Sequence, residues 1–598
     1  MIDFWVWQVI LHGSLFVKIL LGDSVMPLEN ILHETQFCVI GGGLAGMGAA
    51  IAAARHGIKT LLMHERPVPG GNASGEIRMW ICGSKQLLET GLVEELRLEN
   101  RYRNPAGNYS IWDSITYEMV AMQENLTVLF NCSCLDAETG DGKIISVKGY
   151  QQTTQQFHVV KADFFADCSG DSILAPLTGA KFRVGREAKD EFKETLAQNE
   201  PDSHTMGMSC LLQAREMDSP QKFIPPSWAK SYPSEEDFPK RGHQMGWSQN
   251  FWWVELGGMD NSIADTEKLR DELLKTIFGV WDHMKNHGDH GVENFAVDWV
   301  GFLPGKRESR RYVGDYIINQ NDVLSGGNFY DAVAYGGWPI DDHHPGGILH
   351  NGVANTNIIP ENPYTIPLRS LYSCNISNLL FAGRNISASH TALSSTRVMA
   401  TCMLLGQAVG TTVAVAGKYG KSIRQTAQEH YTEIQQMLLD DDCTLPGFRR
   451  NIPESVKSAA LSSSAGDPEV LRNGVDRDYP GEINFWSGKA GDKVVYEYPE
   501  LTRFSGIRLV FDSDLDNRLI KRDHLNQPAN YFLNAPERPT PESVMKSFAI
   551  TADGKEIVRV TDNHQRLVRI NMDFAARKIE FLPLDAEAKK LFAFELNS

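Results

Sequence analysis

The spacing of apolar residues in the first part of the chain predicts a strand, a turn, a helix and a second strand. Residues 37–40 form an apolar run of strand type, residues 41–46 are a glycine-rich turn, and residues 47–55 are an alanine-rich helical stretch. A further apolar run follows at residues 58–63. This order is typical of a parallel βαβ unit that binds a dinucleotide across its glycine turn.

The rest of the pattern predicts a returning strand and helix, an irregular middle segment and a β-rich end. Residues 378–384 indicate a strand that ends in a turn, and a long helix of small residues follows residues 394–396. The segment between 180 and 300 is irregular apart from an amphipathic helix at about 265–286. Beyond a polar helix at 423–439, turn signals separate short apolar runs, which predicts a β-sandwich. These runs are residues 494–498, 507–511, 558–560 and 578–581.

Composition and charge narrow the class of protein. The chain has 598 residues, 42% of them hydrophobic, and a formal net charge of −17, which is typical of a multidomain globular protein. The acidic balance argues against a nucleic-acid backbone or an anionic membrane surface as the main partner, because both require clustered positive charge. Nine cysteines without regular spacing favour a reducing compartment, and hence a cytoplasmic location.

The first 25 residues form a separate apolar segment. Residues 4–21 are largely apolar, but Gln8, His12 and Lys18 interrupt a run that is already at the short limit for a membrane span. We therefore expect no membrane span. A secretory signal begins with basic residues, whereas Asp3 precedes this run, so export is left open but not favoured. An extension outside the fold is the simplest interpretation.

Three glycines of the turn have separate predicted roles. Gly41 permits the tight turn, Gly43 lets the backbone approach a pyrophosphate, and Gly46 lets the helix and the strand pack closely. The N-terminus of the following helix attracts the phosphate charge. Glu65 lies 19 residues beyond Gly46, where a carboxylate accepts the hydrogen bonds of an adenosine ribose.

Two further segments favour a flavin over a nicotinamide dinucleotide. The loop at residues 69–75 follows Glu65 and is placed to continue along an extended cofactor. The helix after residues 394–396 would direct its N-terminus toward the N1 side of an isoalloxazine, which favours the anion of the reduced flavin by about 0.3 to 2 kcal/mol. A nicotinamide needs no such returning helix.

Three other segments carry a family resemblance, and it extends over roughly residues 35–415. They are residues 70–78 (GGNASGEIR), 166–171 (ADCSGD) and 307–311 (RESRR). The chain resembles the FAD-dependent oxidoreductases related to the fumarate reductase and succinate dehydrogenase flavoproteins. This resemblance implies noncovalent FAD. It also implies FAD contacts at Gly41, Gly43, Gly46, Glu65, Arg66, Gly71 and Ser74, with Gly383 and Arg384 near the pyrophosphate or ribityl chain.

The expected fold class is α/β, with a Rossmann-like FAD-binding domain that carries an inserted cap domain, plus a C-terminal all-β sandwich-like domain. Residues 1–34 are an N-terminal extension, and 35–180 and 301–420 are the two parts of the FAD-binding domain. The inserted cap or substrate domain is 181–300, a helical linker is 421–460, and the β-sandwich domain is 461–598.

Charged and imidazole side chains gather in three later segments. Residues 305–312 hold four positive charges in six positions before a predicted helix, and Arg307 is the first candidate for fixing an anionic or polyhydroxy substrate or the cofactor. The breaker-rich loop at 338–347 has the composition of a functional loop. Either His343 or His344 in this loop is a candidate base for alcohol oxidation. His390 is the rival base, and Arg397 is a candidate anion holder.

The middle segment offers aromatic residues and histidines for which packing is the favoured interpretation. Three tryptophans and a phenylalanine lie within residues 247–253, with a substrate-stacking wall as the alternative. His283 and His287 lie one helical turn apart but lack a convincing third ligand, and Cys132 and Cys134 lack a second pair. We expect no metal site.

The residues together predict an FAD-dependent oxidoreductase that transfers a hydride between a small polar substrate and noncovalent FAD. A hydroxyl-bearing carbon of a sugar, polyol or hydroxy acid is the favoured hydride source. The expected partners are a small-molecule substrate and an electron acceptor whose identity is left open, as is a homo-oligomer.

Two alternative functions remain. A C–C bond reductase or dehydrogenase of fumarate-reductase type would require His390 or Arg397 for turnover. A carbohydrate-binding or lyase-like protein with structural FAD would bind glycan through residues 460–598, which faintly resemble discoidin-like modules. Trp486 would then be a stacking residue, although packing or dimerisation is the favoured role of this domain.

Overall fold

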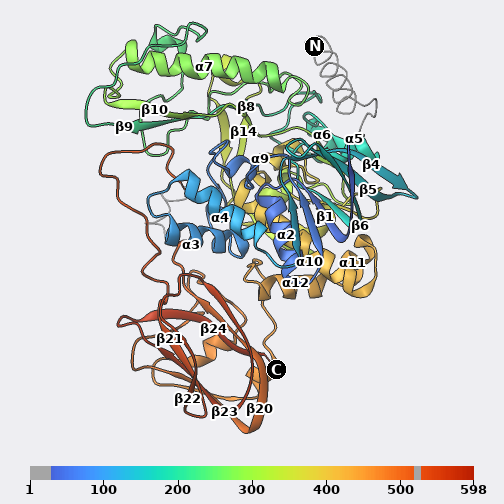
Figure 1. The fold of residues 1–598 in the computed structure, drawn as a ribbon, viewed down its shortest axis with the longest axis vertical. Coiled ribbons are helices and arrows are strands. Elements are labelled where there is room, and N and C mark those ends of the chain that lie inside the picture. Colours follow the sequence, from blue (N-terminus) through green and yellow to red (C-terminus); the bar gives the residue numbers. More distant parts are fainter. Residues whose placement is uncertain (1–27, 517–526, 598) are drawn as a thin grey trace, which may run out of the picture.

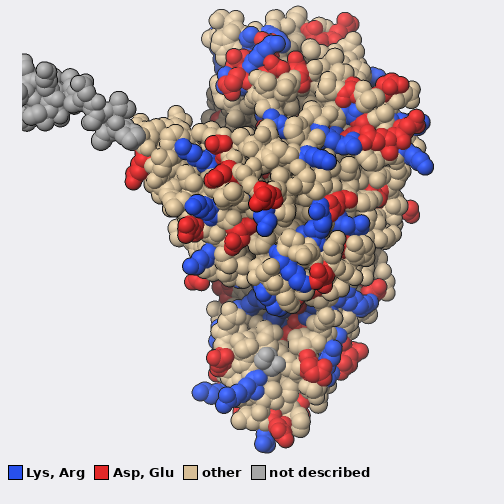
Figure 2. All heavy atoms as spheres, turned by 90° about the vertical axis from the view of Figure 1, so that its right-hand side faces the viewer, with Lys and Arg blue, Asp and Glu red and all other residues tan. Residues whose placement is uncertain are grey.

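The computed structural model describes residues 28–516 and 527–597. Figure 1 shows a central α/β body, with a second body around helix α7 at one end and a β body at the other. On the face drawn in Figure 2, basic and acidic side chains are interspersed. The interpretations of residues 1–25 as an extension, a rejected span or an export signal lie outside the described residues.

A seven-stranded sheet forms the centre of the α/β body. Its order is β3-β2-β1-β6-β5-β4, and β17 pairs with β6. The neighbours β1, β2, β3, β6 and β17 are parallel, whereas β4 and β5 are antiparallel additions. The strands are β1 (Asn30–Ile40), β2 (Thr60–Met63), β3 (Leu126–Leu129), β4 (Cys132–Gly140), β5 (Lys143–Gln151), β6 (Gln156–Asp167) and β17 (Leu379–Phe381). The sheet thus includes residues 30–34, which we had assigned to the extension.

Two helices of small residues cover this sheet and touch backbone to backbone. They are α2 (Leu44–Arg55) and α10 (Met399–Tyr419). A Cβ at Gly406 would lie 1.9 Å from the carbonyl oxygen of Ala45, so only glycine allows this approach. Among the described residues α10 is the one helix long and apolar enough to cross a membrane, and 94% of its apolar window is buried inside the protein. It is the core helix of the α/β body.

Further helices surround this core. They are α3 (Leu92–Arg103), α4 (Tyr109–Ala121), α5 (Leu174–Thr178), α9 (His390–Thr396), α11 (Ile423–Glu429) and α12 (Tyr431–Asp440). The single helix expected at 423–439 is therefore two helices that meet at His430.

The middle segment builds a body with its own core. Helix α7 (Thr266–Asn286) lies over the antiparallel pair β9 (Leu212–Glu216) and β10 (Phe295–Val300), as Figure 1 shows. Phe251 and Trp253 are buried in this core, so packing is the correct interpretation for these two.

The basic segment at 305–312 is extended. It forms β11 (Gly305–Lys306), which pairs with β8 (Met208–Ser209), and β12 (Arg311–Tyr312), which pairs with β7 (Phe182–Arg183). The helix predicted to follow directly is wrong, because the next described helix, α8, spans Gln320–Ser325.

The C-terminal body is a separate antiparallel sheet domain. Its order is β19-β24-β20-β23-β21-β22, with β18 beside β20. The strands are β18 (Ala460–Ser463), β19 (Trp486–Gly488), β20 (Val494–Phe511), β21 (Phe548–Ala552), β22 (Lys555–Val560), β23 (Leu567–Pro583) and β24 (Lys589–Asn597). Trp486 is 1% exposed and donates its indole N–H to the Ser463 hydroxyl at 2.7 Å. It is a core residue, not a stacking platform.

The predicted α/β class, with a parallel Rossmann-like core and a separate antiparallel β domain, is confirmed by this arrangement.

Candidate active site

A first cavity of about 290 Å³ lies along the carboxyl ends of β1, β2 and β6. Seven of the nine predicted cofactor residues line it: Gly41, Gly43, Glu65, Arg66, Gly71, Gly383 and Arg384. Met399, the first residue of α10, also lines it, so the N-terminus of that helix faces the cavity. A flavin dinucleotide is favoured by these two features, a glycine turn at one end and a helix dipole at the other.

The glycines of the turn differ in how much space a side chain would have at each position. Gly41 has φ of +97° and a Cβ there would lie 2.6 Å from the backbone of Cys168, while a Cβ at Gly46 would lie 1.8 Å from the Gly41 carbonyl oxygen. A Cβ at Gly43 meets nothing closer than Gly71 Cα at 3.8 Å and would face the cavity. Gly41 and Gly46 therefore allow the turn and the packing, and Gly43 leaves room for a ligand.

The other two predicted cofactor residues, Gly46 and Ser74, do not line the cavity. Gly46 packs against the Gly41 carbonyl oxygen instead. Ser74 is fully buried and donates its hydroxyl to the Gly71 carbonyl oxygen at 2.8 Å. Its contact is with the backbone of the loop rather than with the cavity.

Asp171 joins its own segment, residues 166–171, to the basic segment at 305–312 and to the late turn at Arg384. Its carboxylate accepts from Lys306 Nζ at 2.8 Å, from Ser309 Oγ at 2.8 Å and from Arg384 Nη2 at 2.6 Å. Burial opposes ionisation, but Arg384 and Lys306 hold the pKa of Asp171 well below its usual range. The carboxylate therefore stays charged and fixes both cations at the cavity wall.

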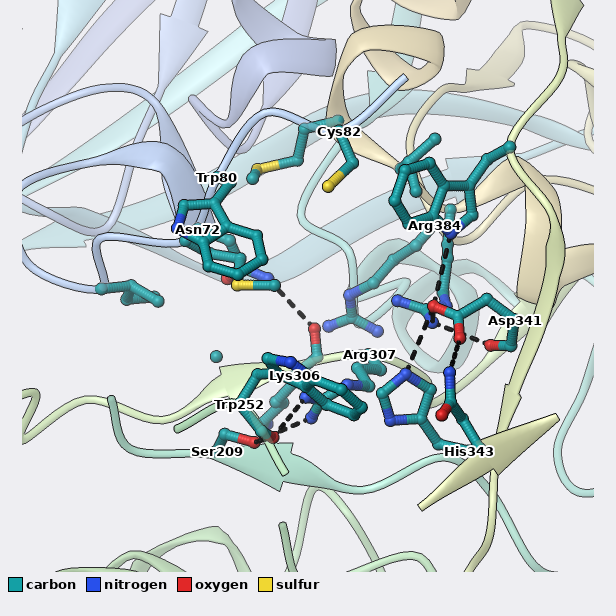
Figure 3. A pocket seen from close by; sticks show the side chains of 18 of the residues that line it. Asn72, Trp80, Cys82, Ser209, Trp252, Lys306, Arg307, Asp341, His343 and Arg384 are labelled. Atoms are coloured by element: carbon teal, nitrogen blue, oxygen red, sulfur yellow. Dashed lines mark hydrogen bonds and ion pairs between the residues drawn. The ribbon is translucent and has the colours of Figure 1, made fainter. Parts of the chain in front are cut away.

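A second cavity of about 270 Å³ continues from the first. The two share six lining residues: Asn72, Ile77, Lys306, Arg384, Arg397 and Met399. In Figure 3, Trp80 and Asn72 lie on one side of the second cavity and Asp341 and His343 on the other. A small molecule here would thus lie next to whatever occupies the far end of the first cavity.

Four charged or imidazole side chains at the wall of this second cavity, with Glu255 behind them, form a line of alternating charge. The line runs Arg307, Glu255, His343, Asp341, Arg397. His343 Nδ1 lies 2.6 Å from Glu255 Oε2, and its Nε2 lies 3.4 Å from Asp341 Oδ2. Arg307 Nη1 lies 3.5 Å from Glu255 Oε2, and Arg397 Nη2 lies 3.1 Å from Asp341 Oδ2. The carboxylates of Glu255 and Asp341 thus bring together three residues that the sequence had suggested, which are Arg307, His343 and Arg397.

The two carboxylates of this line remain ionised despite their burial. Burial raises the pKa of Glu255, but Arg307 and His343 bring it below its ordinary value. Burial likewise opposes the ionisation of Asp341, and His343 and Arg397 hold its pKa well below its usual range. His343 therefore stands between two ionised carboxylates at the wall of the cavity.

Three tryptophans line the second cavity, and two of its lining residues carry a buried nitrogen without a hydrogen-bond partner. Trp80, Trp252 and Trp338 line it, and Trp252 packs edge-on against the His343 ring at 5.2 Å between centroids. Trp80 Nε1 and Arg397 Nε are buried and have no hydrogen-bond partner among the described residues. Buried donors of this kind are satisfied by a ligand or by water. Trp252 thus lines the cavity, where a stacking wall stays a prediction, whereas Trp253 packs in the core.

Two of the predicted histidines lie outside both cavities. His344 is exposed and stacks on His350 with 3.6 Å between ring centroids. His390 is buried, with Nδ1 2.9 Å from Glu308 Oε2 and Nε2 3.0 Å from Asp342 Oδ1. His390 lines neither cavity, which distinguishes it from His343, although each ring lies between two carboxylates.

Sequence reasoning missed Glu255 and Trp80, and it gave no separate role to Asp341 or Asp171. Glu255 is the one charged residue between 251 and 258, within an otherwise apolar run. A carboxylate in such a run is rarely buried without a partner, and this signal was available. Trp80 stands in a loop without periodicity, so no sequence signal distinguished it.

The glycine turn, the returning helix and the continuous cavities define a dinucleotide-binding flavoprotein. The chain belongs to the family described as FAD dependent oxidoreductase, whose model matches residues 36–438. The expectation of an FAD-dependent oxidoreductase is thereby confirmed, and FAD is the cofactor. A comparison with curated proteins finds no match.

Solved structures show distant likenesses. A geranylgeranyl bacteriochlorophyll reductase-like protein from Thermoplasma acidophilum is 13% identical, with 69% of this chain and 86% of that chain covered and a TM-score of 0.32. The flavin-dependent brominase Bmp2 is 10% identical, with 68% and 86% covered and a TM-score of 0.33. A family 32 carbohydrate-binding module from Streptococcus pneumoniae EndoD is 12% identical, with 24% and 97% covered and a TM-score of 0.17. At these values the likenesses carry no information on substrate.

Proposed function

We propose that this FAD-dependent oxidoreductase oxidises a hydroxyl-bearing carbon of a small polar, carbohydrate-like substrate bound in the second cavity. The observation that supports this proposal is the line of charge around His343, at the wall of a cavity that opens into the cofactor cavity. Oxidation of an alcohol requires a base for the hydroxyl proton beside a hydride acceptor. When bound, FAD supplies that hydride acceptor.

His343 is the proposed base. Its Nδ1–H donates to Glu255 Oε2 at 2.6 Å, so the lone pair of the neutral ring is on Nε2, which would take the hydroxyl proton and then face Asp341 Oδ2 at 3.4 Å. The imidazolium so formed lies between the carboxylates of Glu255 and Asp341. His344 is not proposed as the base, because it lies on the surface and not at the cavity.

Arginine and tryptophan side chains provide the proposed substrate contacts. Arg397 lines both cavities, and its unpartnered Nε is available to donate to a substrate oxygen. Arg307 is held by Ser209 Oγ at 3.0 Å and by the Trp252 carbonyl oxygen at 2.9 Å, so it supplies a fixed positive charge. The faces of Trp80 and Trp252 suit the apolar face of a sugar or polyol.

The body around α7 is the proposed cap over this site. Ser209, Leu211 and Trp252 from this body line the second cavity, while Arg397 and Met399 come from the α/β body. A substrate would therefore be enclosed between the two bodies, which excludes water from the transfer of the hydride.

A second candidate function is reduction or desaturation of a C–C bond, as in the fumarate-reductase type. The specific observation in its favour is Arg397 at the wall shared by both cavities, where a cation would hold a carboxylate of an unsaturated acid. Under this function Arg397 is essential, while His343 is dispensable for the chemistry.

The test compares His343→Gln with His344→Gln, adjacent histidines of which one lines the cavity. The rate of flavin reduction is measured by anaerobic stopped-flow spectroscopy with the most effective donor among sugars, polyols and hydroxy acids. Loss of a general base is expected to slow this step by about 10²- to 10⁴-fold in His343→Gln. His344→Gln should reduce at the wild-type rate.

Two results would argue against the proposal. Equal rates in the wild-type protein and His343→Gln would exclude His343 as the base. Rapid oxidation of chemically reduced enzyme by an unsaturated dicarboxylate, lost in Arg397→Gln, would favour the C–C bond reductase.

A further inference from the structure

Four side chains of the α7 body converge on one point outside both cavities. They are Glu235, His243, His283 and His290, and one ligand atom from each lies within 4.8 Å of every other. Glu235 belongs to the short helix η2 (Glu235–Asp237), and His283 to the last turns of α7. His243 and His290 lie in loops, so the cluster joins segments up to 55 residues apart.

The three imidazoles present the same nitrogen to the same carboxylate. Glu235 Oε1 lies 3.2 Å from His283 Nε2 and 3.1 Å from His290 Nε2. Its Oε2 lies 3.1 Å from His243 Nε2. The three imidazole side chains are only 9%, 0% and 7% exposed for His243, His283 and His290. They form a buried set of nitrogens closed by one acidic side chain.

Backbone carbonyls orient two of these rings from outside. His243 Nδ1 lies 2.9 Å from the Arg241 carbonyl oxygen, and His283 Nδ1 lies 2.7 Å from the Tyr232 carbonyl oxygen. A carbonyl accepts only from N–H, so the proton of each neutral ring is on Nδ1 and the Nε2 lone pair faces inward. Histidines that bind metal are held in this way.

His290 adds an independent observation. Its Nε2 is buried and has no hydrogen-bond partner among the described residues, although the Glu235 carboxylate is close. Inward-facing lone pairs repel one another unless a cation or a proton lies between them. The arrangement is therefore incomplete without a positively charged group at its centre.

We propose that Glu235, His243, His283 and His290 bind one Zn²⁺ ion. Three imidazole nitrogens and one carboxylate oxygen are a donor set that suits zinc, and four protein ligands leave no open position, which is typical of a structural site. Tetrahedral ligands at 2.0 to 2.1 Å from zinc lie about 3.4 Å apart. Binding would draw the widest pairs of ligand atoms closer by about 1 Å.

The proposed ion would fix residues 234–243 to helix α7. Through these residues it would also fix the loop that follows His343. Arg241, two residues before His243, donates to the carbonyl oxygens of Gly347 at 3.0 Å and His350 at 3.1 Å. The site therefore has a structural role next to the catalytic loop, and it takes no part in the proposed oxidation.

The proposal replaces the expectation of no metal, which rested on His283 and His287. His287 lies outside the ligand set, with its ring centroid 6.5 Å from that of His283 and its Nε2 3.4 Å from Asp282 Oδ2. Helical spacing pointed to His287 as the partner of His283, whereas the proposed partners are Glu235 of η2 and His243 and His290 from loops.

The experiment uses the untagged full chain after treatment with a chelator. Zn²⁺ is titrated by calorimetry, and Co²⁺ is added in parallel to record d–d bands at wavelengths where oxidised flavin does not absorb. We expect one Zn²⁺ per chain and a Co²⁺ spectrum of four-coordinate type. His243→Gln and His290→Gln should weaken Zn²⁺ binding by at least about 100-fold, since even an outer-shell partner costs 10- to 100-fold.

His287→Gln is the matched control and should keep the wild-type affinity, because its ring is not directed at the cluster. Retention of the flavin spectrum in each variant shows that the chain is folded. Absence of stoichiometric Zn²⁺ in the wild-type chain would overturn the proposal. Equal binding by the wild-type chain, His243→Gln and His290→Gln would also overturn it.

Discussion

His390 shows how the surroundings of a residue decide its role. The side chain stands just before the flavin helix, where its chemistry suits a base, yet Glu308 and Asp342 occupy both ring nitrogens. Although burial opposes it, these two carboxylates raise the pKa of His390 to about 10. The residue is thus protonated at neutral pH and pairs with both Glu308 and Asp342, whereas His343 lines a cavity.

This cation predicts a pH dependence of stability. The folded pKa of about 10 lies above the unfolded value of 6.5, so the stabilisation is complete below about pH 6.5 and is lost as the pH rises to about 10. In His390→Gln both carboxylates lose their partner. Its melting temperature should therefore lie well below that of the wild-type protein at pH 6 and approach it toward pH 10. Thermal unfolding across this range measures the gap, and a gap independent of pH would contradict the prediction.

At the scale of elements, the contact between α2 and α10 positions the cofactor end of the site. Gly406 and Gly410 bring α10 against the backbone of α2, with a Cβ at Gly410 only 2.3 Å from the Ala49 carbonyl oxygen. The same contact sets the N-terminus of α10 at the wall shared by both cavities. The close packing of α2 and α10 therefore determines where the N-terminus of α10, with its helix dipole, meets the cavities.

Gly406→Ala should destabilise the protein, while Gly417→Ala in the same helix should not. The added methyl group at 406 has no space, and overpacking typically costs about 1 to 3 kcal/mol or more. Gly417 is exposed, and its nearest neighbour is Ile58 Cδ1 at 3.4 Å, so alanine should stabilise the helix by up to about 1 kcal/mol. Urea unfolding and FAD affinity compare the two. Similar stability in both variants would show that the helices have room to separate.

At the scale of the whole molecule, buried ion pairs hold the β domain against the α/β body. Arg566, next to β23, lies 2.7 Å from Asp442 Oδ2 and 3.4 Å from Glu94 Oε2 of α3. Arg477 donates to the Leu88 carbonyl oxygen at 3.0 Å. Because Arg566, Asp442 and Glu94 are all buried, removal of this one cation leaves two buried carboxylates without it.

Arg566→Ala is accordingly expected to cost about 3 to 5 kcal/mol of stability. Arg569→Ala is the control, since Arg569 is 42% exposed and pairs with Asp441 at 2.8 Å, a surface contact worth at most about 1 kcal/mol. Calorimetry of both variants measures the effect. A loss of stability in Arg569→Ala but not in Arg566→Ala would mean that other contacts hold the β domain.

Local signals account for what the sequence could predict. The glycine turn, β1, α2 and β2 are adjacent in the chain, so spacing alone indicated a cofactor cavity at Gly41, Gly43 and Glu65. The other lining residues that were expected, Arg66, Gly71, Gly383 and Arg384, came from the family resemblance. The break of the helix at His430 lies in a polar stretch without a strong stop signal.

Contacts between distant loops could not be predicted in this way. Glu255 and His343 meet across 88 residues, and Tyr531 returns from the β domain to pair with β9, where it donates to the Ala214 carbonyl oxygen at 2.9 Å. Neither pairing leaves a periodic pattern in the chain. The cluster of three histidines around Glu235 also joins distant segments, so no local pattern predicted it.

Anaerobic titration of the purified flavoprotein tests the central proposal most directly. Pools of sugars, polyols, hydroxy acids and dicarboxylates are added separately while the visible flavin bands are recorded. We predict that a hydroxylated pool bleaches these bands and that saturated dicarboxylates do not. Flavin bands that persist with every hydroxylated pool, or a protein that cannot be loaded with FAD, would contradict it.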